Sequence, residues 1–394
     1  MNSIDELAIN GGRPARKKMI PYGKQSINLW DVFSLSKTLL SDFITSGPKV
    51  TEFEEAIAKY VNTKYAVAVS SGTAALHMAV FAADIKQGDE VLVASMTFAA
   101  SSNCVLYQGG TPVFVDIDPE TLNIDINDLK SKINPKTKAI IPVDFTGQSV
   151  DIDAIMQIAR EHDLIVIEDA AHALGSEYKG RKVGSDAHMT MFSFHPVKPI
   201  TTGEGGIIVT NNEHFYHRML MFRTHGITKE PSKMNHYEGP WFYEQHYLGY
   251  NYRLTDIQAA LGLSQLKRLD RFIAKRRRIA SRYSQLLKDI DGISTPKEPD
   301  YSNSGWHLYI IKVDDKFVRK EIYEALIAEK IGVMVHYIPV FYHPYYLSLG
   351  YDQSQCTNAK DSYEKIISLP IFPKMKNKDI LSVVNAIKKL YTFF

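Results

Sequence analysis

The sequence is short of cysteine, of long apolar runs and of excess charge, and each shortage argues against a class of protein. Only two of its 394 residues are cysteines, Cys104 and Cys356, and no CxxC spacing occurs, so we expect neither a disulfide framework nor a metal site. No apolar run reaches the length of a membrane span. The 46 basic and 44 acidic residues are interspersed, so the formal net charge is only +2 and nothing predicts nucleic-acid binding.

What the chain does contain is ordinary for a globular protein. Hydrophobic residues make up 45% and charged residues 23%, and the length allows two domains or one large domain with an appendage. The first residues, MNSIDELAINGGRP, are too polar and acidic for a signal peptide, so we expect a cytoplasmic enzyme or regulator. One basic run, Lys275 to Arg278, falls within a helical pattern with an apolar face, and we interpret it as a solvated helix face.

Seven short apolar runs, separated by segments of helix length, predict the fold. Several of these runs are apolar throughout, as expected for strands that are buried on both faces of a sheet. The sequence therefore predicts an α/β fold with a seven-stranded, mostly parallel sheet covered by helices. The expected strands are Tyr65–Val69, Glu90–Ala94, Pro112–Val115, Ala139–Val143, Leu164–Ile167, Thr190–Phe194 and Gly206–Thr210.

The regions on either side of this sheet differ in pattern. Residues 1–24 are predicted to form an irregular arm, and residues 25–267 a large domain that holds the sheet and begins with a helix over Leu29–Leu40. Residues 268–394 mix helices and strands in an order that suits a smaller α+β domain. The elements expected there are a long helix from about Arg268, the strand His307–Val313, the helix Val318–Glu329, the strand Gly332–His336 and the helix Lys378–Leu390.

One loop, between the last two expected strands of the sheet, presents a lysine. Lys198 lies between Pro196 and Pro199, and glycines follow at positions 203, 205 and 206. Prolines fix the backbone beside the lysine, and glycines allow tight turns and the close approach of a ligand. Schiff-base chemistry needs a neutral lysine amine that is held in one direction. A lone lysine in a turn is usually a plain surface residue, so this interpretation needs support from the rest of the chain.

Other chemically useful residues follow neighbouring strands of the expected sheet. The segment Ser71–Thr73 opens a helix whose free amide groups suit a phosphate, although a simple N-cap serine would give the same sequence. Phe98 follows the second strand and either packs in the core or stacks on a flat ring. Asp169 follows the fifth strand, with His172 just beyond it. A carboxylate at this place needs a partner, or else it caps the next helix.

Together these residues match the needs of one cofactor. In parallel α/β sheets ligands bind beyond the carboxyl ends of the strands, where all of these side chains are expected. Pyridoxal 5'-phosphate (PLP) requires a lysine for its imine, an acidic partner for its ring nitrogen and an anion site for its phosphate. The order and the shared strand-end placement of the residues therefore predict a PLP site.

A series of motifs along nearly the whole chain resembles the DegT/DnrJ/EryC1/StrS sugar aminotransferases, which have the type I PLP-dependent transferase fold. Three longer segments are most similar to the branch of this family that serves pseudaminic acid synthesis. The resemblance implies transfer of an amino group from L-glutamate to C4 of a UDP-linked 4-keto-6-deoxy-N-acetylhexosamine. The motifs are Leu7–Gly12, Gly47–Pro48, Ser71–Thr73, Glu168–His172, Ser193–Lys198, Gly203–Gly206, Gly249–Leu254 and Val335–Tyr337, and the longer segments are His172–Gly184, Phe192–Gly206 and Arg253–Lys267.

The resemblance also implies roles for single residues. Lys198 would hold PLP as a Schiff base and later shuttle the proton, and Asp169 would hold the proton of the pyridinium nitrogen. The remaining implied cofactor contacts are Phe98 on the ring face, His172 near the ring hydroxyl, Gly72, Thr73 and Ser193 at the phosphate, and Asn251 reaching the same phosphate from a partner subunit. That last contact implies a homodimer with shared active sites. The implied sugar-nucleotide contacts are Tyr22, Asp42, Phe43, Ile44, Thr45, His336 and Tyr337.

Three alternatives remain beside this interpretation. The motifs around the cofactor do not separate the proposed sugar from those of perosamine-type, 4-amino-arabinose-type or 3-keto sugar aminotransferases. A deoxygenating branch of the family has histidine at the position of the lysine, so the presence of Lys198 argues against that branch. A regulatory relative that uses PLP or a sugar nucleotide only as a signal would be expected to have a damaged lysine or aspartate, or an added DNA-binding segment, and neither occurs.

Overall fold

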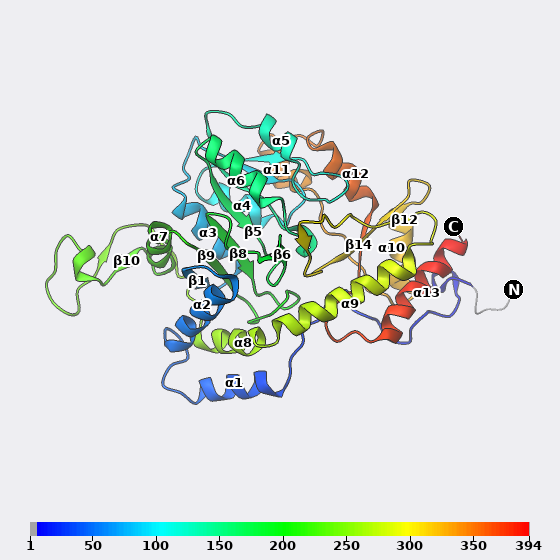
Figure 1. Ribbon diagram of the computed structural model, residues 1–394, viewed down its shortest axis with the longest axis horizontal. Helices are drawn as coiled ribbons and strands as arrows, with labels where there is room; N and C mark the ends of the chain where they lie inside the picture. Colours follow the sequence, from blue (N-terminus) through cyan, green and yellow to red (C-terminus); the bar gives the residue numbers. More distant parts are fainter. Residues whose placement is uncertain (1–5, 394) are drawn as a thin grey trace.

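A seven-stranded sheet lies at the centre of the structure, a computed structural model that describes residues 6–393 (Figure 1). The strand order is β1-β9-β8-β5-β4-β2-β3, and every neighbouring pair is parallel except the two pairs that involve β9. The strands are β1 (Tyr65–Val69), β2 (Glu90–Ala94), β3 (Thr111–Val115), β4 (Thr137–Ile141), β5 (Ile165–Asp169), β8 (Met189–Ser193) and β9 (Gly206–Thr210).

This sheet confirms the predicted α/β fold. All seven strands form where the short apolar runs predict them, and no boundary differs from the prediction by more than two residues. The agreement follows from burial on both faces: along β1, Val67 and Val69 pack into one core while Ala66 and Ala68 pack into another. A strand that is covered on both sides reads as an unbroken apolar run, which is a strong signal in a sequence.

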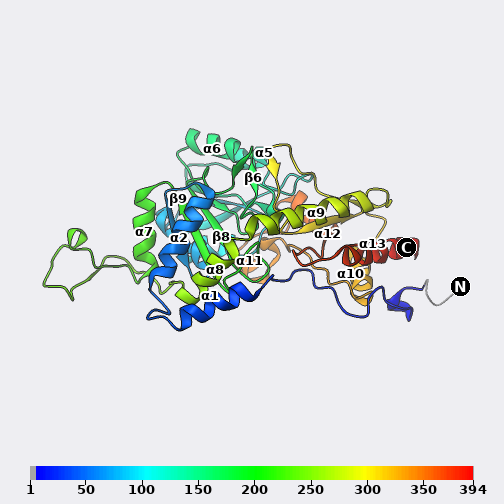
Figure 2. The same cartoon turned by 60° about the horizontal axis from the view of Figure 1, so that its bottom comes forward.

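Helices cover both faces of the sheet (Figures 1 and 2). The helices α3, α4 and α7 pack on the face that includes Val67, and α2, α5, α6 and α8 pack on the opposite face. Their bounds are α2 (Pro48–Val61), α3 (Gly72–Ala82), α4 (Ala100–Tyr107), α5 (Ile126–Ser131), α6 (Ile152–Glu161), α7 (Glu213–Arg223) and α8 (Asp256–Leu266).

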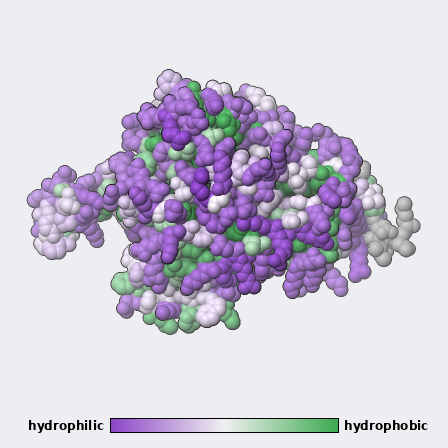
Figure 3. Space-filling view, in the orientation of Figure 1, coloured by the Kyte–Doolittle hydropathy of each residue, from purple (hydrophilic) through white to green (hydrophobic). Residues whose placement is uncertain are grey.

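Helix α1 (Leu29–Leu39) turns its polar side inward and its apolar side outward. Its Asp31 is fully buried, where it pairs with Arg268 and accepts hydrogen bonds from Ser264 and Gln265. By contrast, Trp30 is 72% exposed and Phe33 62% exposed. Figure 3 shows hydrophobic residues gathered at the lower edge of the molecule, where α1 lies in Figure 1. A helix that faces water with its apolar side indicates a surface that binds something.

The C-terminal part of the chain has a core of its own. A small antiparallel sheet, in the order β12-β14-β15, packs with helices that include α9, α10 and α13. The strands are β12 (Ile293–Ser294), β14 (Tyr309–Val313) and β15 (Ile366–Leu369), and the helices are α9 (Leu269–Leu287), α10 (Arg319–Ala328), α11 (Pro344–Ser348), α12 (Thr357–Lys365) and α13 (Asn377–Phe393). This mixture of helices and strands confirms the predicted α+β character of the smaller C-terminal part.

Helix α9 belongs to both cores. Near its start, Phe272 and Ile273 pack against the large sheet, whereas Ile279 and Tyr283 further along pack with the small sheet. The boundary between residues 267 and 268 therefore falls just before a helix that links the two parts, and the proposed division into domains stays a prediction.

Arg276 on this helix corrects an expectation. It is 1% exposed, so the interpretation of the basic run Lys275 to Arg278 as a solvated helix face is wrong at this residue. The helical repeat explains the burial, because position 276 shares a face with the buried residues Phe272, Ile279 and Tyr283.

The expected strand Gly332–His336 is also wrong. Within residues 6–393 its only bridge is between Met334 and Ser368, and Ile331, just before the segment, bridges to Ile20. It meets the N-terminal segment on one side and β15 on the other, so it never forms a continuous ladder with either. The apolar run that predicts a strand here packs between two different neighbours instead.

The N-terminal segment is tied to the C-terminal part of the molecule. The buried carboxylate of Glu329 accepts hydrogen bonds from the backbone N–H groups of Ala8 and Ala15 and pairs with Lys389. Further along, the N–H of Gly332 donates to the carbonyl of Ile20 at 2.7 Å. The first five residues of the predicted arm 1–24 lie outside the described residues. The rest of the arm runs along the C-terminal part toward α1 (Figure 2).

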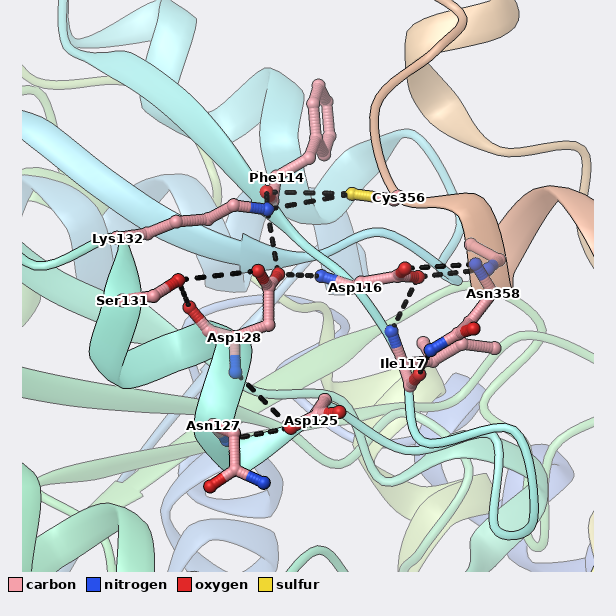
Figure 4. Close-up of polar contacts among 11 residues, drawn as sticks. Phe114, Asp116, Ile117, Asp125, Asn127, Asp128, Ser131, Lys132, Cys356 and Asn358 are labelled. Carbon is pink, nitrogen blue, oxygen red and sulfur yellow. Dashed lines mark hydrogen bonds and ion pairs between the residues drawn. The ribbon is translucent and has the colours of Figure 1, made fainter.

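A second polar link joins the large sheet to helix α12 (Figure 4). Just after β3, the carboxylate of Asp116 accepts hydrogen bonds of 2.9 Å from the backbone N–H groups of Asn358 and Ala359 in the first turn of α12. Behind it, Asp128 accepts from the backbone N–H of Asp116 and pairs with Lys132 at 2.7 Å. A carboxylate at a helix N-terminus is favourable, so this contact holds the small part against the large one.

The remaining strands are short. A three-stranded ribbon contains β6 (Glu177–Tyr178), β7 (Arg181–Lys182) and β13 (Ser302–Asn303), and a two-stranded ribbon contains β10 (Ile227–Thr228) and β11 (Glu244–Gln245). The second ribbon lies in a segment that projects away from the body of the protein (Figure 1). Within residues 6–393, no helix combines the length and the apolar character needed to cross a membrane.

Candidate active site

A cavity of about 350 Å³ lies beyond the carboxyl ends of the central strands. Its walls come from the starts of α3 and α4, the end of β5, the loop between β8 and β9, and the C-terminal part of the chain. The predicted site residues that line it are Tyr22, Gly72, Thr73, Phe98, Asp169, His172, Ser193, Lys198, His336 and Tyr337. The structure thus brings together, in one place, residues as far apart in the sequence as Tyr22 and Tyr337.

Lys198 lies on the loop between β8 and β9. Its backbone N–H donates to the carbonyl of His195 at 2.9 Å, and the hydroxyl of Thr201 donates to the carbonyl of Phe194, so the loop folds back on itself. Burial lowers the pKa of Lys198 to about 8, and the nearby carboxylate of Asp169 partly opposes this effect. The amine is therefore neutral in a useful fraction of molecules near physiological pH, which is the form that attacks a carbonyl group.

Asp169 ends β5 and is held by hydrogen bonds rather than by a salt bridge. Its Oδ2 accepts from the hydroxyl of Ser101 at 2.6 Å, and its Oδ1 accepts from the backbone N–H of Ala171 at 3.1 Å. Burial raises the pKa of Asp169, while these two hydrogen bonds and the charge of Lys198 oppose the rise. The carboxylate thus has donors on one side and an open cavity on the other, where a protonated ring nitrogen could be bound.

His172 is a neutral imidazole. Burial lowers its pKa well below the usual value, and the charge of Lys198 lowers it further. Its Nε2 lies 3.2 Å from the hydroxyl of Tyr337, and its ring centroid lies 4.4 Å from that of His307. Its Nδ1 is buried and has no hydrogen-bond partner within residues 6–393. A buried polar atom of this kind needs a partner, and here it belongs to a residue that lines the cavity.

The start of α3 lies at one corner of the cavity. Ser71 caps the helix, since its hydroxyl accepts from the backbone N–H of Ala74 at 3.1 Å. The structure therefore confirms the N-cap interpretation of Ser71, yet Gly72 and Thr73 still line the cavity together with Ser193. A Cβ at position 72 would lie 3.1 Å from that of Ser193, so glycine lets the two segments approach closely. The positive end of the helix faces this corner of the cavity.

This donor set fits PLP. The cavity offers an amine with a lowered pKa, a hydrogen-bonded carboxylate, a buried imidazole nitrogen that lacks a partner, and a helix N-terminus beside a serine. Phe98 is 61% exposed and lines the cavity, so it does not pack in the core and is free to stack on a flat ring. No group of three or more metal-ligating side chains occurs within the described part of the chain.

The predicted sugar-nucleotide contacts divide into two groups. Tyr22, His336 and Tyr337 line the cavity, and the rings of Tyr22 and His336 lie 5.5 Å apart. The turn of Asp42, Phe43, Ile44 and Thr45 does not line it; instead Thr45 bridges to Thr255. Asn251 is exposed and is likewise absent from the cavity of its own chain. The roles of Asn251 and of the turn stay predictions, and that of Asn251 depends on a partner subunit.

Some cavity residues were not expected from the sequence. Ser101 and Thr97 form a short relay to Asp169, with their hydroxyl oxygens 2.7 Å apart, but nothing distinguishes them from other small polar residues at a helix start. His307 was expected to begin a strand, and its chemistry appears only when the C-terminal part packs against His172. A histidine directly before an apolar strand was the one available signal.

Comparisons with known proteins agree with this geometry. A family model described as the DegT/DnrJ/EryC1/StrS aminotransferase family matches residues 31–388. The spore coat polysaccharide biosynthesis protein SpsC of Bacillus subtilis is 42% identical over 380 residues, which cover 95% of this chain and 98% of that protein. The UDP-4-amino-4,6-dideoxy-N-acetyl-beta-L-altrosamine transaminase of Campylobacter jejuni is 40% identical over 385 residues, which cover 95% of this chain and all of that protein.

A solved structure is similar over the same length. PseC of Helicobacter pylori, an aminotransferase involved in the biosynthesis of pseudoaminic acid, superposes with a TM-score of 0.90 and 33% identity. The match covers 96% of this chain and 100% of that one.

Proposed function

The chain belongs to the DegT/DnrJ/EryC1/StrS aminotransferase family, and we propose that it aminates C4 of a UDP-linked 4-keto-6-deoxy-N-acetylhexosamine with L-glutamate as the amino donor. The family, the enzyme class of sugar aminotransferase and the cofactor PLP are confirmed predictions. The product would be UDP-4-amino-4,6-dideoxy-N-acetyl-β-L-altrosamine. The observation that carries the proposal is the placement of Lys198, Asp169 and the start of α3 around one cavity.

The residues of the cavity divide the chemical work. When bound, PLP supplies a carbonyl group that combines with amines and a ring that takes up electrons. Asp169 would hold the ring nitrogen, Lys198 the carbonyl carbon, and Gly72, Thr73 and Ser193 the phosphate. Once its amine is free, Nζ of Lys198 can accept a proton from the substrate carbon and return it to another carbon, because a pKa of about 8 makes both protonation states accessible.

The two histidines near the amine add no charge to its surroundings. Burial keeps the imidazoles of His172 and His307 neutral, so they do not add positive charge beside Lys198. The hydroxyl of Tyr337 stays protonated, because burial raises its pKa, and it fixes the ring of His172 by a hydrogen bond. Tyr337 and His336 also form the wall from the C-terminal part, which shields the site from water.

The choice of sugar is supported by the relative from Campylobacter jejuni and by the three long segments that resemble the pseudaminic acid branch. A second candidate, amination of another nucleotide-linked keto sugar, is favoured by the similarity to SpsC, which is named for spore coat polysaccharide biosynthesis. The regulatory alternative has no observation in its favour, since Lys198 and Asp169 are both present.

A direct test uses the holoenzyme with L-glutamate and a panel of UDP- and dTDP-linked 4-keto sugars. Mass spectrometry of the products identifies the sugar that gains an amino group, and NMR assigns the carbon and the stereochemistry. Amination at C4 of the UDP-linked N-acetyl sugar supports the proposal. Preferred amination of a dTDP-linked or 3-keto sugar would assign the enzyme to another branch, and no amination of any sugar would favour the regulatory alternative.

The proposed enzyme is a homodimer with shared active sites. The outward apolar side of α1 and the adjacent exposed Phe43 and Ile44 form a surface that a second copy would cover. In this arrangement Asn251, which is exposed, would contribute to the phosphate site of the partner. A cytoplasmic location is part of the same proposal, and both cysteines are buried and unpaired, as expected in a reducing compartment.

Shared sites make a specific prediction for mixed subunits. Lys198→Ala and Asn251→Ala homodimers should each be impaired, because each damages both sites. A heterodimer of one subunit of each kind has one intact site, so mixing the two variants should restore activity. Two impaired variants that do not complement each other, although they form mixed dimers, would contradict a role for Asn251 in the partner's site.

A further inference from the structure

Arg276 is the largest fully buried side chain among residues 6–393, and it has no carboxylate partner there. A buried charge is costly unless polar groups compensate it, so its surroundings need an explanation. Burial lowers the pKa of Arg276 to about 10, which still leaves the guanidinium charged at physiological pH. The protein therefore keeps a permanent positive charge in its interior.

Carbonyl groups surround this guanidinium. Its Nη1 donates to the carbonyls of Ile371, His307 and Trp306 at 3.0, 3.1 and 3.2 Å, and its Nη2 lies 3.5 Å from the carbonyl of Val197. Nη1 carries two hydrogens, so the three bonds are partly shared. The four carbonyls come from three separate segments of the chain. The planar guanidinium of arginine, with its several N–H groups, can bind all of them better than the ammonium group of a lysine could.

Two of these segments line the cavity, and the third is bonded to a residue that lines it. Val197 directly precedes Lys198, and the ring of His307 packs on that of His172. Ile371 donates its backbone N–H to the carbonyl of Tyr22 at 3.0 Å. The side chain of Arg276 thus contacts the backbone of three residues: Val197, next to the reactive lysine; His307, which packs on His172; and Ile371, which holds Tyr22.

The backbone at Trp306 needs this support. Trp306 has a φ of +49°, in the left-handed region that a bulky residue rarely adopts. The turn places the carbonyls of Trp306 and His307 together on the guanidinium.

We propose that Arg276 is a positioning residue of the transamination: by binding the carbonyls of Val197, Trp306, His307 and Ile371, it sets where Lys198 and His307 lie relative to the cofactor. It touches neither cofactor nor substrate. This role depends on the aminotransferase activity of the chain but not on the identity of the sugar.

Arg277 provides a matched control. It is the next residue of α9 and also binds two carbonyls of the segment before β14, those of Ser304 at 2.9 Å and Asn303 at 2.8 Å. Within residues 6–393 its side chain makes no hydrogen bond to the lysine loop or to His307. A general need to anchor this segment predicts similar effects for both arginines, whereas the proposed role predicts an effect for Arg276 alone.

The test compares Arg276→Met, Arg276→Lys and Arg277→Met holoenzymes after reconstitution with PLP. For Arg276→Met we expect kcat to fall by about 100-fold in both half-reactions, as expected for a small displacement of a reactive group, with little change in KM. Arg276→Lys keeps the charge but not the planar fork, so its kcat should lie between those of Arg276→Met and wild type. Arg277→Met should keep a kcat close to that of wild type.

A readout without substrate separates positioning from stability. The absorbance of the bound cofactor is titrated with pH, and its midpoint should move in both Arg276 variants and stay in place in Arg277→Met. Thermal unfolding of the apoproteins measures the loss of stability separately. If folded Arg276→Met has the kcat and the midpoint of wild type and only unfolds at a lower temperature, the residue is structural and the inference is wrong. If Arg276→Met does not fold, the same two measurements on Arg276→Lys decide in the same way.

Discussion

The hydroxyl of Ser101 donates a 2.6 Å hydrogen bond to Oδ2 of Asp169, while the hydroxyl oxygen of Thr97 lies 2.7 Å from that of Ser101. Because Ser101 uses its only proton on the carboxylate, Thr97 must donate to Ser101. This relay places two hydroxyl groups behind the residue that would hold the cofactor nitrogen. It stabilises the charged form of Asp169 against the effect of burial.

Replacing Ser101 by alanine should therefore weaken catalysis at low pH most strongly. Without the hydrogen bond the pKa of Asp169 rises further, so activity is lost at a higher pH as the solution is acidified. At neutral pH we expect kcat to fall by about 10-fold, which corresponds to the free energy that a hydrogen bond to a charged group usually contributes. The pH profile of kcat measures both effects. Ser102→Ala is the control, because Ser102 is a buried neighbour that binds Tyr346 instead; an equal loss in both variants would contradict the relay.

Asp169 itself should be needed for turnover more than for cofactor retention. Asp169→Ala removes the anion that keeps the ring nitrogen protonated, while the phosphate corner and Lys198 remain. We expect kcat to fall by about 100-fold or more, while some PLP stays bound after gel filtration. Steady-state kinetics and the cofactor content measured by absorbance give the two values. Wild-type turnover in this variant would show that the role assigned to Asp169 is wrong.

Lys198 should be the lysine that carries the cofactor. Treatment of the holoenzyme with borohydride fixes the lysine-bound cofactor, and peptide mass spectrometry locates it. We expect the adduct at Lys198 and no adduct in Lys198→Ala. A reduced adduct on any other lysine of the wild-type protein would remove the basis of the proposed site.

The same lysine should make the apoprotein less stable at neutral pH. Burial lowers its pKa in the folded state to about 8 from the ordinary value of 10.5, so between these values the unfolded chain binds a proton that the folded one releases. The contribution of Lys198 to stability therefore rises with pH across this window, and below it the folded protein bears the full cost of the buried charge. Apo Lys198→Met should be more stable than apo wild type by about 1 to 3 kcal/mol at pH 7. Urea unfolding from pH 7 to 10.5 should show this difference shrinking; a constant difference would contradict the lowered pKa.

Glu329 should control the N-terminal segment. Glu329→Ala leaves Lys389 and the backbone N–H groups of Ala8 and Ala15 without their partner, at a cost of about 3 kcal/mol. Because the same segment carries Tyr22 to the cavity, we also expect KM for the sugar nucleotide to rise. Urea unfolding and kinetics measure the two effects. Arg16→Ala, which breaks a more exposed ion pair of the segment with Asp379, is the control and should change stability little.

The large sheet could be predicted from the sequence because its strands are buried on both faces. The positions of Lys198 and Asp169 followed from the same pattern, since both come after apolar strands whose carboxyl ends meet at one edge. The segment Gly332–His336 could not be predicted in this way, because its apolar residues pack against two different neighbours and form no ladder. An apolar run in a sequence shows that its residues are buried but not what covers them.

Contacts that depend on long-range packing could not be predicted from the sequence either. In the sequence Arg276 resembles its charged neighbours. It is buried because it lies on the inward face of α9, whereas Arg278 lies on the outward face and is exposed. The sequence left two interpretations of Phe98 open, core packing or stacking on a ring, and the cavity that decides between them forms only where His336 and Tyr337 meet the large sheet.

Helix α9 limits where the chain can be divided into fragments. A fragment that stops at residue 267 would lack Leu269, Phe272 and Ile273, and the apolar surface that these side chains cover beneath the large sheet would meet water. A fragment that starts at residue 268 would expose the same three side chains at its own end. Neither half is therefore suited to expression alone, and insertions or circular permutation are better tolerated in the projecting segment that carries β10 and β11 than at the junction before α9.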